Sequence, residues 1–114
     1  MTWLSRAKFQ TLTIVAASSI TTSYVAAVTL TDPAVMLAIK NGTNGDVVLG
    51  VDGTTAWWGF PATSGSAYDV ETNSPDVSQL MLPAGTTIYI KWEGSAPGSP
   101  TGNVYIELMQ VVTQ

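Results

Sequence analysis

The sequence predicts an all-β protein: an antiparallel β-sandwich or a jelly-roll-like small barrel, with an extended N-terminal arm. Three observations predict this fold. Short runs rich in Val, Ile, Thr and Tyr alternate apolar and polar residues with a period of two. Clusters of Gly, Asn, Asp and Pro recur about every ten residues, as turns do between short strands. One side of each run is apolar and the other polar, which is typical of antiparallel sheets buried on one face.

The expected strands span residues 9–16, 22–30, 34–40, 47–51, 86–92 and 103–109. Their apolar faces carry Leu12, Ile14 and Ala16; Tyr24, Ala26, Val28 and Leu30; Val35, Leu37 and Ile39; Val47, Leu49 and Val51; Ile88, Ile90 and Trp92; and Val104, Ile106 and Leu108. Asn41-Gly42 and Asp52-Gly53 are expected to mark strand ends around 47–51, because both pairs favour tight turns. The run 93–102, with two prolines, predicts a long loop.

The chain of 114 residues is expected to form one domain, with residues 1–10 as an arm and residues 11–114 as the sandwich. The arm carries Trp3, Leu4 and Phe9. Its first eight residues are the only stretch of the chain whose residue spacing is compatible with a helix. Because large apolar groups on a terminus need a surface to cover them, we expect the arm to dock on a neighbouring subunit. The early positive charge and following apolar residues also suggest a signal peptide, but polar residues interrupt the apolar stretch.

Composition excludes several functions. Cysteine and histidine are absent, which removes disulfides, thiolate metal sites and the usual general base near neutral pH. Without histidine the many Ser and Thr residues form no standard catalytic triad, so we expect no enzyme activity and no cofactor. Only four basic residues and a net charge of -4 argue against a nucleic-acid partner. No apolar run approaches the roughly 18 to 20 residues of a membrane span, so no membrane partner is expected.

Charged residues make up 11% of the chain, well below the roughly 25% of typical soluble domains. A surface with so few charges suits a subunit that packs against other subunits. We therefore expect a homo-oligomer or a larger assembly.

Two groups of polar side chains are candidate sites. Calcium ligation is suggested by Asn41, Asn44, Asp46 and Asp52, with Thr43 between them. Their spacing does not follow an EF-hand loop, and we interpret them as turn residues that hydrogen-bond to the backbone. Asp69 and Glu71 would share one face of a strand, as a glycosidase carboxylate pair can, but we interpret them as solvated.

Tryptophans are the strongest candidates for binding. Adjacent residues of a strand point to opposite faces, so either Trp57 or Trp58 should enter the core while the other faces outward. An exposed tryptophan can anchor a protein interface or stack on a sugar ring. The residues expected at protein interfaces are Trp3, Leu4, Phe9, Trp57, Trp58 and Trp92, with Phe60, Tyr89 and Tyr105 in reserve.

Several segments resemble small β-rich structural proteins encoded among the virion genes of tailed bacteriophages. They are SITTSY at 19–24, AIKNGTNGDVVLGVDGTT at 38–55, YDVETNSPD at 68–76, LPAGTTIYIKW at 82–92 and SPTGNVYIEL at 99–108. Trp57-Trp58-Gly59 and the apolar arm depart from that family's pattern. The resemblance implies a virion subunit that contacts capsid, portal or tail subunits.

The first hypothesis is therefore a virion structural protein, either a capsid decoration (cement) protein or a head-to-tail neck component. The alternative is a carbohydrate-binding or host-surface adhesion module that uses Trp57 or Trp58 together with Ser, Thr and Asn-rich loops. A third hypothesis is a secreted single-domain protein whose signal peptide has been removed.

Overall fold

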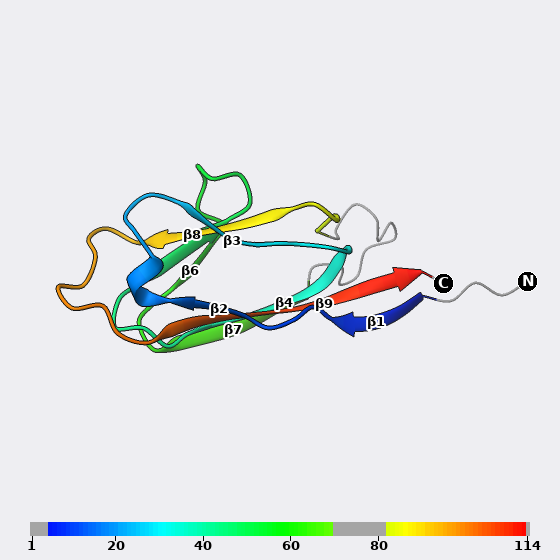
Figure 1. The fold of residues 1–114 in the computed structure, drawn as a ribbon, viewed down its shortest axis with the longest axis horizontal. Helices are drawn as coiled ribbons and strands as arrows, with labels where there is room; N and C mark the ends of the chain where they lie inside the picture. Colours follow the sequence, from blue (N-terminus) through cyan, green and yellow to red (C-terminus); the bar gives the residue numbers. More distant parts are fainter. Residues whose placement is uncertain (1–4, 70–81, 114) are drawn as a thin grey trace, which may run out of the picture.

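Two antiparallel sheets pack face to face in a β-sandwich, which confirms the all-β fold class (Figure 1). The computed structural model describes residues 5–69 and 82–113. Within these ranges the only helical element is a short 3-10 turn, η1 (Ala17–Ser19). No helix of the described residues is long and apolar enough to cross a membrane.

The first sheet, called sheet A here, is built around the longest strand. Its strands are β1 (Ser5–Phe9), β2 (Thr13–Ala16), β4 (Ala34–Asn41), β7 (Ser64–Asp69) and β9 (Asn103–Thr113). They lie in the order β1-β9-β4-β7, and β2 pairs with β9 on the same side as β1. One edge of β9 therefore pairs with β2 near its start and with β1 near its end, while the other edge pairs with β4.

The second sheet, sheet B, has four strands: β3 (Val25–Thr29), β5 (Val47–Gly50), β6 (Trp58–Phe60) and β8 (Thr87–Trp92). They lie in the order β3-β8-β5-β6. The predicted long loop is confirmed, since residues 93–102 join β8 to β9 without regular structure.

The core lies between the sheets and follows the predicted alternation on four strands. The inward-facing side chains of β4, β5, β8 and β9 are almost fully buried: Leu37, Ile39, Val47, Leu49, Ile88, Ile90, Trp92, Val104, Ile106 and Leu108. These strands are central in their sheets, so each inward side chain meets apolar neighbours from both sides and from the opposite sheet.

The prediction for the N-terminal arm needs correction. Residues 5–9 form β1, which pairs with β9 of the same chain from Ser5↔Thr113 to Phe9↔Met109. Lys8 adds an ion pair with Asp32 at 2.8 Å. The segment docks on its own domain because an unpaired edge of β9 offers it backbone hydrogen bonds. Together β1 and the end of β9 form a two-stranded ribbon that extends past the start of β4 (Figure 1). Trp3 and Leu4 lie outside the described residues.

The faces of two edge strands also differ from the prediction. In β2 the core-facing residue is Val15, whereas Ile14 points outward and is exposed, as is Leu12 just before the strand. In β3 the register shifts between Ala26 and Val28. The bulge lets both Val25 and Val28 pack on the core, so no single period-two face runs through this strand.

A buried asparagine closes one end of the sandwich. Asn41 is the last residue of β4, as predicted, and is fully buried. Its side-chain amide donates hydrogen bonds to the carbonyl oxygens of Gly45, Phe60 and Pro61 at 2.9, 3.0 and 3.1 Å. Its Oδ1 accepts hydrogen bonds from the backbone N–H and the hydroxyl of Thr43. One side chain thus links the β4–β5 turn to the end of β6.

We expect Asn41→Ala to lower the free energy of unfolding by about 3 kcal/mol, because it leaves several buried groups without a partner. Urea denaturation followed by circular dichroism measures this loss. The matched control is Asn44→Ala, which removes hydrogen bonds to Ser99 and Thr101 that are exposed to water. The control is expected to cost less than about 1 kcal/mol. Equal losses in the two variants would contradict the central role of Asn41.

Candidate functional site

The outer face of sheet A carries a cluster of exposed apolar side chains. Among the described residues the exposed large hydrophobic side chains are Phe9 (67% exposed), Ile14 (56%), Trp57 (54%) and Leu12 (44%). Three of these four lie beside one another on sheet A. We call this surface the apolar face and define it by Phe9, Leu12, Ile14, Tyr105 and Met109.

Strand pairing brings the apolar face together. Phe9 of β1 is paired with Met109 of β9, and Ile14 of β2 is paired with Tyr105. Paired residues in adjacent strands lie on the same side of a sheet. Leu12 sits in the link between β1 and β2 and lines the same depression as Tyr105. An apolar surface of this kind on a protein exposed to water is typical of an interaction site.

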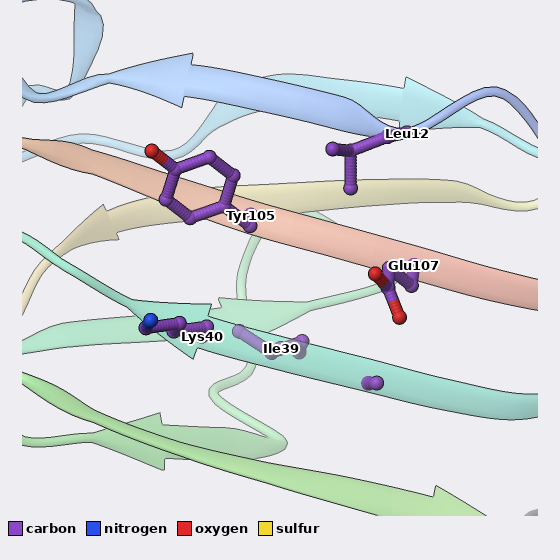
Figure 2. Close-up of a pocket in the computed structure, with 6 residues that line it drawn as sticks. Leu12, Ile39, Lys40, Tyr105 and Glu107 are labelled. Atoms are coloured by element: carbon purple, nitrogen blue, oxygen red, sulfur yellow. The ribbon is translucent and has the colours of Figure 1, made fainter.

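A shallow depression of about 430 Å³ lies on this face (Figure 2). Its lining residues are Leu12, Ala38, Ile39, Lys40, Tyr105 and Glu107. A second depression of about 310 Å³, beside Phe9, shares Leu12 and Glu107 with the first. Figure 2 shows the lining side chains on three neighbouring segments, with Leu12 before β2, Tyr105 on β9 and Lys40 on β4. The open, shallow shape fits a flat protein contact better than an enclosed small-molecule site.

Two opposite charges lie at the margins of the apolar face. Lys40 is opposite Tyr105, and Glu107 is opposite Ala38, so the two charged residues are diagonal neighbours across β4 and β9. Both side chains are exposed. Within the described residues the one ion pair is that of Lys8 with Asp32, so Lys40 and Glu107 do not pair with each other.

The adjacent tryptophans lie at the edge of sheet B, and one packs on the core while the other is exposed, as the sequence predicts. Trp58 is paired with Leu49 and packs against the core. Trp57 faces outward, with its backbone N–H donating to the Leu49 carbonyl oxygen. The two rings are tilted by 57° with centroids 5.7 Å apart. Trp57 is therefore the exposed member of the pair, just before β6 at the edge of sheet B.

Trp92 is a core residue, which corrects the prediction that it lies at an interface. It is only 1% exposed, and its indole Nε1–H donates to the Ile20 carbonyl oxygen at 2.9 Å. Its position follows the alternation of β8, in which Ile88, Ile90 and Trp92 all face inward. Of the residues expected at interfaces, the structure brings Phe9 into the apolar face and leaves Trp57 exposed elsewhere.

Leu12, Ile14 and Met109 are the surface residues that the sequence reasoning missed as site candidates. The pattern placed Leu12 and Ile14 on a core face because both are apolar and two residues apart. The adjacent apolar residue Val15 argued against this placement, because either Ile14 or Val15 could take the inward position. Only the pairing of β2 with β9 decides between the two registers.

The candidate calcium ligands hydrogen-bond to backbone groups of their own and of neighbouring loops. Asp46 accepts a hydrogen bond from the backbone N–H of Ala62, and Asp52 accepts from those of Thr54 and Thr55. The described part of the chain contains no group of three or more acidic side chains that could hold a metal ion. Glu71 lies outside the described residues, as does the side-chain environment of Asp69.

Asp52 stabilises the loop that leads to Trp57. The N–H groups of Thr54 and Thr55 donate to its Oδ1 at 3.0 and 2.8 Å. These hydrogen bonds favour the ionised carboxylate and lower the pKa of Asp52 from 3.8 to about 2. Gly53 in this loop has φ +76°, a conformation that glycine adopts without strain, as expected for the predicted Asp-Gly turn.

We expect Asp52→Asn to reduce the acid sensitivity of the protein. Because the folded pKa lies below the unfolded one, Asp52 contributes stability above about pH 4 that is lost as the pH falls towards about 2. Asparagine keeps an acceptor oxygen but does not titrate in this range. Urea unfolding at several pH values between 5 and 2 measures the slope.

A flatter slope in the Asn variant supports this role. Asp32→Asn is the comparison variant. Lys8 lowers the pKa of Asp32 at a distant position, so this variant should also flatten the slope, and the effects of the two substitutions should add. An unchanged slope in Asp52→Asn would contradict the assignment.

Comparisons with protein-family models, with curated proteins and with solved structures found no match. The fold class is therefore established by the two sheets of this chain alone. The functional conclusion depends on the chemistry of the apolar face and of Trp57.

Proposed function

We propose that this protein is a structural subunit of a tailed-bacteriophage virion. It would be a capsid decoration (cement) protein or a component of the head-to-tail neck. In this role it binds other virion proteins, namely capsid, portal or tail subunits, and stabilises the particle without catalysing a reaction. The observation that carries the proposal is the apolar face, which a neighbouring subunit would cover.

The energetics of the apolar face suit a repeated contact. Fully burying a Leu, Ile or Phe side chain stabilises a complex by about 1.5 to 3 kcal/mol before the cost of association is counted. Leu12, Ile14 and Phe9 are already partly covered, so each adds only part of that amount. One such contact is modest, but symmetric repetition of modest contacts in a particle produces a durable assembly.

Composition and sequence resemblance support the same proposal. The chain has 11% charged residues, which favours a surface covered by neighbours over one that faces water throughout. Segments at 38–55, 82–92 and 99–108 resemble virion structural proteins. They correspond to the end of β4 and β5, to β8, and to the start of β9, which are the central strands of the sandwich.

Trp57 favours a second candidate function, binding of carbohydrate on a host surface. Its indole is 54% exposed and lies after a loop rich in threonine. Stacking on a sugar ring needs such an indole together with side chains that bond hydroxyl groups. The nearby Asp52 already uses Oδ1 for the backbone of its own loop, which makes this the weaker candidate.

We expect the double variant Leu12→Asp/Ile14→Asp to bind purified virions at least about tenfold more weakly than the natural chain, because two charges would enter an apolar contact. Virions stripped of the protein, mixed with recombinant chain and sedimented, measure this binding. The matched control is Ala26→Asp, which places a charge on the exposed side of β3 in sheet B.

Circular dichroism and a thermal melt confirm that the variants fold. Binding of the double variant equal to that of the natural chain would contradict the proposed role of the apolar face. A change in Trp fluorescence on adding host polysaccharide, lost in Trp57→Ala, would instead favour the adhesion function.

A further inference from the structure

We propose that the neighbour covering the apolar face is a second copy of this chain. The two copies would pack sheet A against sheet A across a twofold axis and form a symmetric dimer. This inference rests on the proposed function, because it names the first partner of the surface that the proposed function uses. It also leaves Trp57, which precedes β6 of sheet B, available on each copy for contact with a different virion protein.

The charges on the apolar face are self-complementary. Lys40 and Glu107 are both exposed on the same face, lie on adjacent strands and form no ion pair with each other within the chain. In a twofold interface every contact occurs twice: if residue i of one copy contacts residue j of the other, then residue j of the first copy contacts residue i of the other. Lys40 of each copy can therefore meet Glu107 of the other copy, which gives two ion pairs from one pair of residues.

Packing of sheet on sheet is the usual way to cover an apolar sheet face. Two faces pack about 10 Å apart with their strands aligned within about 30°, and their side chains interdigitate. Leu12 and Tyr105 border the depression of about 430 Å³, so each copy offers both projecting side chains and a hollow to receive them. The same chain therefore supplies both halves of a complementary contact.

The size of the face indicates that all of it takes part in the contact. Eight residues of β4 give a length of about 27 Å, and four neighbouring strands give a width of about 19 Å. That footprint of about 500 Å² is smaller than the roughly 800 Å² per partner of a standard stable interface. Phe9 and Met109 lie in one row with Met36 of β4, so they are within this footprint. A dimer of ordinary stability therefore needs the whole face, Phe9 included, in the contact.

The test is a charge-reversal experiment on the whole chain, followed by sedimentation equilibrium. The natural chain is expected to be a dimer at micromolar concentration. Lys40→Glu alone places two carboxylates opposite each other at both contacts, and Glu107→Lys alone places two ammonium groups opposite each other there. Each variant alone should raise the dimer dissociation constant by about tenfold or more, because like charges face each other across the contact.

Mixing the two variants is the decisive measurement. A Lys40→Glu copy and a Glu107→Lys copy present opposite charges to each other at both contacts. The mixture should therefore form heterodimers with a dissociation constant within about threefold of the natural homodimer. Glu93→Lys is the matched control, since it makes the same charge change at an exposed residue beyond the end of β8 and should leave the dimer unchanged.

Phe9→Ser and Ile14→Asp are the second test and should give folded monomers. A natural chain that sediments as a monomer at about 100 µM, well above the dissociation constant of a standard interface, overturns the dimer. So does a mixture that does not associate more tightly than either variant alone. Neither result contradicts the proposed virion function. If the chain is a monomer and its binding to virions still depends on Leu12 and Ile14, then a different protein covers the apolar face.

Discussion

The strict alternation of residues along β9 is the constraint on which both the core and the candidate site depend. Val104, Ile106 and Leu108 face inward and are almost fully buried, while Tyr105, Glu107 and Met109 form the floor of the outer face. A slip of one residue would move every core side chain to the surface. Because β9 pairs with β4 on one edge and with both β1 and β2 on the other, it fixes the register of all of them. Packing inside the domain and contact outside it are thus set by one strand.

The two outer faces of the sandwich have different chemistry. Sheet A carries aliphatic and aromatic side chains around a shallow depression, with one lysine and one glutamate at its margins. Sheet B has an edge tryptophan, Trp57, and a lysine, Lys91, whose ammonium lies 4.9 Å from the centre of the Tyr24 ring. A subunit with two unlike surfaces on opposite sides can join a copy of itself through one and another protein through the other. That arrangement suits a particle in which many small contacts repeat.

Buried polar side chains hold the loops in fixed positions at both ends of the sandwich. Asn41 holds the β4–β5 turn against the end of β6, and the indole of Trp92 holds the end of β8 against Ile20. At the opposite end, Gln110 is fully buried and donates to Gln10 Oε1 and the Asp32 carbonyl oxygen, where the ribbon leaves the body. Such bonds are costly to break inside an apolar core, so they fix where each loop crosses from one sheet to the other.

The amino-acid sequence by itself determined the fold class, the strands around Leu37, Leu49, Ile90 and Ile106, and the different burial of Trp57 and Trp58. These features are local: a period of two and a turn residue depend only on neighbouring positions, and central strands are buried regardless of which partner lies beside them. Tertiary structure alone decided that β1 returns to its own chain, and that Ile14 is surface while Val15 packs on the core. The apolar face belongs to this second group. It brings residues 9–14 beside residues 105–109, which are far apart in the sequence. Their pairing depends on which edge of β9 is open, and no local sequence pattern predicts that.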